Sequence, residues 1–177
     1  MKNLLSNSIV YLCGAIDRCP NAGAVWRDMI SPQLACMGVK VLNPLKKACS
    51  VGLESDDHRS VRQTWKEDGQ YDRFASVMKT IGHVDLTMMY RSHFILAYLD
   101  LRVFACGTID EIIKGAEAGK PVLIVCEQGK IHIPDWLWIY ISHTCMFNNF
   151  DEALDYLDGI NIGRIEAPSP WVFLNNG

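Results

Sequence analysis

The residue best suited to chemistry in this sequence is a glutamate near the start of an expected helix. The run Gly107-Thr108-Ile109-Asp110-Glu111 opens a helix that we expect over residues 108–117. One interpretation is a capping box, in which Thr108 and Glu111 each bond a free backbone amide at the helix N-terminus. The other is that the positive end of the helix dipole holds Glu111 ionised, which makes its carboxylate a nucleophile. Cleavage of a glycosidic bond requires such a carboxylate beside a second acid.

The other candidate positions follow from where strands are expected to end. Apolar, β-favouring runs predict strands over 9–16, 39–42, 92–99 and 121–126. The near-continuous apolar character of the last run indicates a parallel sheet covered on both faces. Ligands of such sheets bind in the crevice beyond the carboxyl ends of the strands. We expect that crevice to be lined by residues 11–17 (with Tyr11, Gly14, Ala15, Ile16 and Asp17), Asn43, Asp100 and residues 107–111 (with Gly107 and Thr108).

Segments of helical periodicity alternate with these strands. They predict helices over 23–37, interrupted at Pro32, and over 71–91, 108–117 and 150–157. Residues 46–69 have only a weak hydrophobic period and are predicted to form a long loop with some helix. Alternating strands and helices predict one α/β domain over residues 1–177, a doubly wound parallel sheet with helices on both faces.

Composition excludes several classes of protein. The net charge of −3 is spread along the 177 residues and leaves no continuous basic face, so binding to a nucleic-acid polymer is not expected. No apolar run is long enough to cross a membrane, and residues 1–9 are too polar for a signal peptide, so we expect a cytosolic protein. The seven cysteines have no Cys-x-x-Cys spacing and are interpreted as reduced thiols. Asp56, Asp57 and His58 are adjacent and point in different directions, so no metal is expected.

Several motifs, in this order, resemble the nucleoside 2-deoxyribosyltransferase superfamily, many of whose members are phage-encoded. Tyr11-Leu12-Cys13-Gly14-Ala15-Ile16-Asp17 followed by Trp26-Arg27 is similar to the family's opening "YLAGPI…WR". Val41-Leu42-Asn43-Pro44 is similar to its second-strand "VxNP". Gly107-Thr108-x-x-Glu111, Ala116 and Gly119-Lys120-Pro121-Val122 are similar to "GTxxE…A…GKPV". The matches cover roughly residues 8–126, and their shared order is more specific than any one of them.

The resemblance implies a role for each matched residue. Glu111 would attack the anomeric carbon, Tyr11 would orient it, and Asp85 would contact the sugar or relay a proton to the base. Asp100 would bind the deoxyribose, and Trp26 would belong to the substrate site. The implied reaction proceeds with net retention through a glycosyl-enzyme intermediate and needs no cofactor. The implied partners are a deoxynucleoside or deoxynucleotide, a free nucleobase, and further copies of the chain in a dimer or higher homo-oligomer. The resemblance also implies that a neighbouring subunit contributes to the site, and the residues expected in that contribution are His143, Thr144 and Asn148.

Two departures from the family pattern leave the reaction open. His93 stands where the family has aspartate, either as a neutral structural substitute or as an acid–base group, and Ala15 stands where it has proline. The chain could transfer deoxyribose between bases, hydrolyse deoxynucleoside 5'-monophosphates, or bind nucleotides without turnover. Hydrolysis of a monophosphate would need a cation for the phosphate. The candidates, each of which could equally be a solvated surface group, are Arg18, Arg27, Arg59 and Arg62.

Overall fold

Five parallel strands form one sheet in the computed structural model, which describes residues 2–17, 19–47 and 56–175. The strand order is β2-β1-β3-β4-β5, so the chain reverses its direction of travel across the sheet between β1 and β3. A crevice forms at such a switch point, beyond the carboxyl ends of the strands. The predicted fold class is confirmed. The strands are β1 (Ile9–Gly14), β2 (Lys40–Leu42), β3 (Phe94–Tyr98), β4 (Val122–Val125) and β5 (Met146–Phe147).

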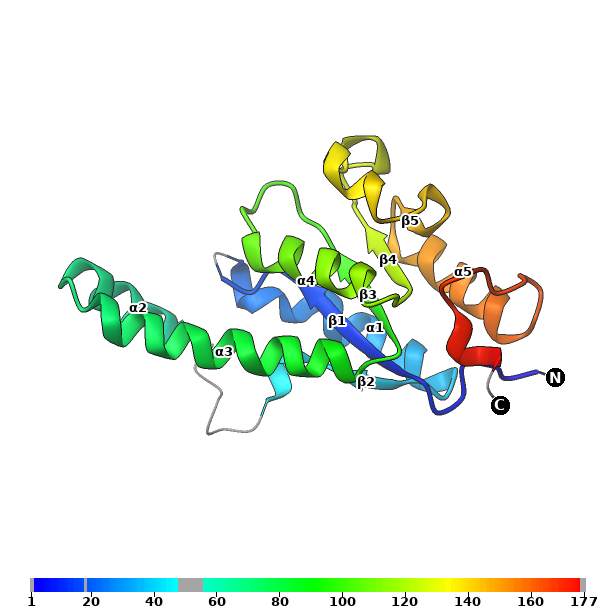
Figure 1. The fold of residues 1–177 in the computed structure, drawn as a ribbon, viewed down its shortest axis with the longest axis horizontal. Helices are drawn as coiled ribbons and strands as arrows, with labels where there is room; N and C mark the ends of the chain where they lie inside the picture. Colours follow the sequence, from blue (N-terminus) through cyan, green and yellow to red (C-terminus); the bar gives the residue numbers. More distant parts are fainter. Residues whose placement is uncertain (1, 18, 48–55, 176–177) are drawn as a thin grey trace.

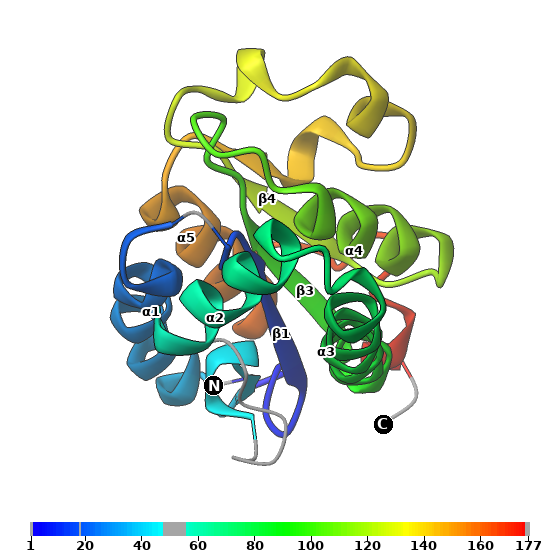
Figure 2. The ribbon, with the colours of Figure 1, turned by 90° about the vertical axis from the view of Figure 1, so that its left-hand side faces the viewer.

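Helices cover both faces of the sheet (Figures 1 and 2). Because side chains alternate along a strand, Val10 and Leu12 of β1 join the core under α1 and α5, whereas Tyr11 and Cys13 join the core under α3 and α4. Because of this alternation, Tyr11 and Cys13 lie on the face of the sheet that α3 and α4 cover. The helices are α1 (Ala24–Cys36), α2 (Asp56–Glu67), α3 (Tyr71–Arg91), α4 (Cys106–Glu117) and α5 (Phe150–Asn161).

The main difference from the predicted elements is α2. Residues 56–67 form a 12-residue helix rather than the expected long loop with some helix, and residues 48–55 lie outside the described part. Helix α2 lies beside the first half of α3, where Trp65 stacks on Arg73 and Lys66 lies over the ring of Phe74. Helix α2 contains only two large apolar residues, Val61 and Trp65, which is too few for a clear helix prediction, and these cation–π contacts join it to α3.

Smaller differences concern element ends. Helix α1 continues through Pro32, where an interruption was expected, and α4 begins two residues earlier than predicted, at Cys106. Strand β5 has two residues, too few for any periodic signal. None of the helices within the described residues combines the length and the apolar character needed to cross a bilayer.

The loop after β1 depends on a glycine at its end. Gly23 is the N-cap of α1 and has φ 66°, in the left-handed region that glycine adopts without steric cost. Its position brings the chain close to Ala15, so that a Cβ added at Gly23 would lie 2.7 Å from the Ala15 carbonyl oxygen. The glycine therefore permits the tight loop that carries Ala15, Ile16 and Asp17.

Replacing Gly23 with alanine should destabilise the protein more than the same change at Gly119. Both residues have positive φ, and a Cβ at Gly119 would meet no atom within 4 Å, so only Gly23→Ala adds a clash to the backbone strain. We expect the free energy of unfolding, measured by urea denaturation, to fall by about 3 kcal/mol for Gly23→Ala and by about 1 kcal/mol for Gly119→Ala. Equal losses would show that the loop shifts away from the new methyl group at no cost.

Candidate active site

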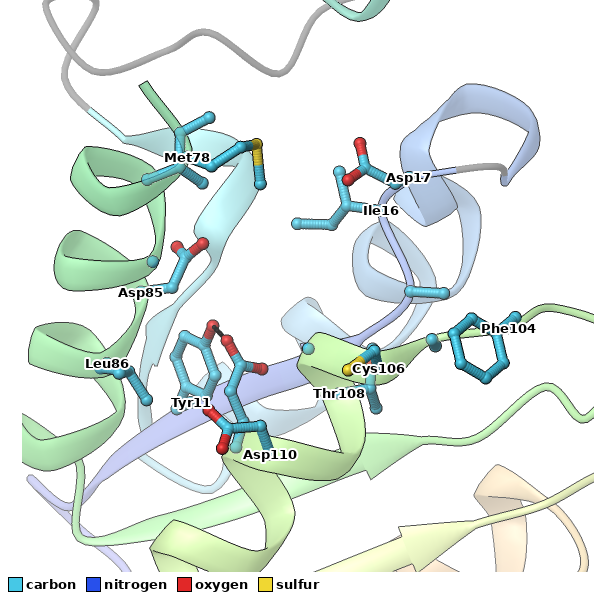
Figure 3. Close-up of a pocket in the computed structure, with 17 residues that line it drawn as sticks. Tyr11, Ile16, Asp17, Met78, Asp85, Leu86, Phe104, Cys106, Thr108 and Asp110 are labelled. Atoms are coloured by element: carbon cyan, nitrogen blue, oxygen red, sulfur yellow. Dashed lines mark hydrogen bonds between the residues drawn. The ribbon is translucent and has the colours of Figure 1, made fainter. Parts of the chain in front are cut away.

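A cavity of about 410 Å³ opens beyond the carboxyl end of β1, between α3 and α4 (Figure 3). Its position is the one predicted from the strand order, at the switch between β1 and β3. It is lined by Tyr11, Gly14, Ala15, Ile16 and Asp17 from β1 and its loop, by Met78, Ile81, Gly82, Asp85 and Leu86 from α3, and by Phe104, Ala105, Cys106, Gly107, Thr108, Asp110 and Glu111 from α4 and the loop before it.

The central contact of the cavity joins β1 to α4. The Tyr11 hydroxyl donates a hydrogen bond to Oε1 of Glu111 at 2.9 Å (Figure 3). The Cys13 thiol donates to the other carboxylate oxygen, Oε2, with Sγ at 3.0 Å. Both donors reach Glu111 because residues two apart on a strand point to the same face of the sheet. The carboxylate is thus held by two groups of β1 while it lines the cavity.

The capping-box interpretation of Thr108 and Glu111 is wrong. Helix α4 has Ala105 as its N-cap, and no side chain caps its first amides. The Glu111 side chain turns toward Tyr11 and Cys13 instead of back toward the start of its own helix. The expected effect of the helix dipole is wrong as well, because Glu111 is the sixth residue of α4 and the effect is confined to the first turn.

Burial, rather than the dipole, dominates the ionisation of Glu111. Desolvation and the negative charge of Asp85 raise its pKa, the bonds from Cys13 and Tyr11 oppose the rise, and the resulting pKa is about 7. The carboxyl group of Glu111 is therefore close to half ionised at neutral pH. Burial, together with the Glu111 charge, also raises the pKa of Tyr11 well above its usual value, so Tyr11 stays a hydrogen-bond donor.

A second acid, Asp85, points into the same cavity from α3 (Figure 3). Asp85 is buried, and its Oδ1 lies 2.6 Å from Nζ of Lys47, whose side chain is also buried. A buried carboxylate has lost most of its hydration and needs a positive partner, and Lys47 is that partner for Asp85. Lys47 was not anticipated, because it lies in a polar segment with no periodic pattern and reaches Asp85 only through the fold. The structure thus brings Tyr11, Asp85 and Glu111 together, with Gly14, Ala15, Ile16, Asp17, Gly107 and Thr108 around them.

Four residues expected in the substrate site do not line this cavity. Trp26 stacks on Phe150 in the core on the other face of the sheet, and Asn43 accepts a hydrogen bond from the Leu45 amide. Asp100 is bound by Arg102 and Gln128. His93 lies just before β3, at the opposite end of that strand from the cavity.

The environment of His93 matches a structural role. Its Nδ1 accepts a hydrogen bond from the Ile9 amide at 2.9 Å, and its ring stacks on Phe173. Desolvation and the nearby charge of Lys120 lower its pKa, which favours the neutral ring. These contacts fit the interpretation of His93 as a neutral structural substitute better than its interpretation as an acid–base group.

Three of the four arginines considered for phosphate binding bond to other groups of the protein. Arg27 is fully buried, and its guanidinium donates to four backbone carbonyls, among them that of Gly14 at 2.8 Å. Arg62 forms an ion pair with Asp17 at 3.0 Å, and Arg59 donates to the Ile16 carbonyl at 2.9 Å. Arg18 lies outside the described residues. Within the described part of the chain, the cavity lining contains four carboxylates and no Lys, Arg or His. The described residues also contain no group of three or more His, Cys, Asp or Glu placed to hold a metal ion.

Two 2-deoxyribosyltransferases of solved structure share this fold. The enzyme of the psychrotolerant bacterium Bacillus psychrosaccharolyticus superposes with a TM-score of 0.55 at 16% identity, over 84% of this chain and 92% of that one. The enzyme from Leishmania mexicana superposes with a TM-score of 0.53 at 16% identity, over 85% of this chain and 96% of that one. No protein-family model matches the sequence, and no curated protein matches it significantly. At this identity the likeness establishes the common fold, and the reaction must be argued from the site.

The raised pKa of Glu111 predicts a pH-dependent gain in stability for Glu111→Gln. Its pKa is about 7 in the folded protein and near 4.5 in the unfolded chain, so the native state binds the extra proton between these values. Stability from this group is therefore highest at low pH and falls as the pH rises through 7. We expect Glu111→Gln to raise the free energy of unfolding by about 2 kcal/mol more at pH 8 than at pH 5.

Chemical denaturation at both pH values measures this difference. The control is Glu117→Gln, which changes an exposed glutamate of the same helix and should have the same small effect at pH 5 and pH 8. A Glu111→Gln effect that does not vary with pH would contradict a raised pKa.

Proposed function

We propose that this protein cleaves the N-glycosidic bond of 2'-deoxynucleosides and transfers the deoxyribose to another nucleobase, with Glu111 as the nucleophile. The observation that supports it most directly is the Glu111 carboxylate, which faces a cavity and is held by Tyr11 of the neighbouring strand. A cavity of about 410 Å³ is within the range that small-molecule sites occupy. The shared fold with 2-deoxyribosyltransferases and the order of the sequence motifs support the same reaction.

In the proposed first step, Glu111 attacks C1' of the sugar. The bond between C1' and the base nitrogen breaks, its electron pair leaves with the base, and the base takes up a proton that comes from water, directly or by relay through Asp85. An ester between C1' and Glu111 forms on the opposite face of the sugar. An acceptor base then attacks C1' through a ring nitrogen and displaces Glu111 as its carboxylate, while the N–H proton of the acceptor is released to water. This second inversion restores the original configuration, so the reaction retains its stereochemistry.

Tyr11 and Asp85 have separate roles in this proposal. The Tyr11 hydroxyl stabilises and orients the Glu111 carboxylate before attack and takes no part in bond making. Asp85 faces the substrate from α3, where it can bind the sugar or pass a proton to the departing base. The ion pair with Lys47, whose Nζ lies 2.6 Å from Oδ1, suits Asp85 to accept hydrogen bonds from sugar hydroxyls, whereas the relay would require Asp85 first to take up the proton that it passes on.

Turnover should depend on Glu111 far more than on its partner Tyr11. We expect Glu111→Ala to lower base exchange between a deoxynucleoside and a free base at least about a thousandfold, because the covalent step is lost. Tyr11→Phe should lower it by about 10 to 100 times, because only orientation and one hydrogen bond are lost. Release of the base is followed by chromatography, with Glu117→Gln as an active control.

The outcomes of this experiment separate the alternatives. Undiminished exchange by the Glu111→Ala variant would reject the nucleophile. Free base and free sugar formed without any acceptor base would indicate hydrolysis rather than transfer. Absence of any product from the wild-type protein, together with measurable nucleoside binding, would indicate a binding module without turnover.

We further propose an uncharged nucleoside, rather than its 5'-monophosphate, as the substrate. A bound phosphate requires cations or several donors to accept its charge. The described lining of the cavity supplies Asp17, Asp85, Asp110 and Glu111 and no cation, and Arg27 is committed to backbone carbonyls. A phosphate would therefore add negative charge to a site that is already acidic.

A comparison of 2'-deoxynucleosides with their 5'-monophosphates tests this preference. We expect kcat/KM to be at least about tenfold higher for the nucleoside, a ratio that corresponds to about 1.4 kcal/mol, because the carboxylates that line the cavity repel a phosphate and the described lining offers it no cation. The same comparison at raised salt controls for long-range repulsion, which salt screens. Faster reaction of the monophosphate would contradict the preference.

We also propose that copies of this chain assemble into a dimer or higher homo-oligomer. Several large apolar side chains between residues 131 and 139 are exposed, which is typical of a surface that another chain covers. They are Ile131, Trp136, Trp138 and Ile139.

A further inference from the structure

Cys13 is the group around Glu111 that the resemblance does not explain. The similar motif of the family has alanine at this place, whereas this chain has a thiol two residues beyond Tyr11 on β1. Cys13 is fully buried, and its Sγ lies 3.0 Å from Oε2 of Glu111 and 3.6 Å from the Thr108 carbonyl oxygen. The thiol therefore has a defined hydrogen-bond acceptor in the active site, unlike a cysteine that only fills space in a core.

We propose that Cys13 is a positioning residue that acts with Tyr11 to hold the Glu111 carboxylate ionised and oriented for attack on the sugar. The proposal rests on the function proposed above. The two donors bind different oxygens, Oε1 by Tyr11 and Oε2 by Cys13, so together they determine the rotation of the carboxylate plane. Each carboxylate oxygen has two lone pairs, so a single bond to each leaves a lone pair free for C1'.

The thiol can serve only as a donor in this place. Desolvation raises the pKa of Cys13 well above its usual value, and the adjacent Glu111 charge raises it further. Cys13 thus stays protonated at any pH where the enzyme would work, and it neither competes as a nucleophile nor adds charge.

Other groups around Glu111 favour its protonated form, and the Cys13 bond opposes them. Desolvation and the Asp85 charge favour the neutral acid, whereas Cys13, Tyr11 and the Arg27 charge favour the carboxylate. Asp110 on α4 lines the same cavity, and Lys47 balances Asp85. The Cys13 bond and the Tyr11 bond both lower the pKa of Glu111. Without the Cys13 bond, a larger share of Glu111 would be protonated, and unable to attack, at neutral pH.

Two readouts test this role, one of which needs no turnover. The first is an NMR titration of Glu111 in protein labelled with ¹³C at the glutamate carboxyl carbons, with Glu111→Gln to assign the signal. The second is the pH profile of kcat for base exchange. Both are measured for wild type, Cys13→Ala and Cys13→Ser, with Cys126→Ala as the control because Cys126 is equally buried and bonds Gln128 instead.

We expect Cys13→Ala to move the Glu111 midpoint and the acidic limb of kcat upward by about one pH unit, since a bond to a charged acceptor is worth about that much. Activity would fall about tenfold at pH 6 and recover toward the wild-type value at pH 9. Cys13→Ser restores a donor and should return both values close to wild type, and Cys126→Ala should leave them unchanged.

A Glu111 midpoint that does not move in Cys13→Ala would overturn the proposal, and so would a loss of kcat that is equal at every pH. If the wild-type protein released no base from any deoxynucleoside, the proposed function would fail. The NMR titration would still decide whether Cys13 controls the ionisation of Glu111.

Discussion

The hydrogen bond between Tyr11 and Glu111 is the contact on which the rest of this site depends. It connects the sheet to α4 and turns a carboxylate away from its own helix toward a cavity. The bond exists because β1 presents alternate residues to the face that α4 covers, and Tyr11 and Cys13 are on that face. The central position of β1, between β2 and β3, keeps these donors in place.

The ionisation of Glu111 is set by opposing effects, of which burial is the largest. Its burial and the charge of Asp85 favour the protonated acid, while two donors from one strand favour the carboxylate, and the result is a pKa of about 7. In the proposed reaction, a carboxylate near half ionisation at neutral pH is partly available for attack and is a better leaving group than a strongly basic one. Stability is given up for this arrangement, as is common at active sites.

The described Lys and Arg side chains near the site bond to residues around the cavity and do not line it. Arg27 donates hydrogen bonds to carbonyls of β1 and of the loop after it. Arg59 of α2 donates to the Ile16 carbonyl, and Arg62 of α2 forms an ion pair with Asp17. Lys47 pairs with Asp85. Helix α2 thus helps to position the loop that lines the cavity, although α2 is distant from it in the sequence. With the cations engaged in this way, the described cavity surface is acidic, which suits an uncharged sugar and base.

Hydrophobic periodicity was sufficient to predict the strands, the main helices and the parallel doubly wound sheet, because burial on one or both faces imposes a local pattern. That pattern failed for α2, which is stabilised by contacts with α3, and for the two-residue β5. The motif order placed Tyr11, Asp85 and Glu111 at one site, and all three line one cavity. Thr-x-x-Glu spacing fits a capping box as well as a nucleophile, so the sequence left that choice open. Only the tertiary structure excludes the capping box and shows the contacts of Cys13 and Lys47. The direction of a side chain depends on donors and charges that folding brings near from distant positions in the chain.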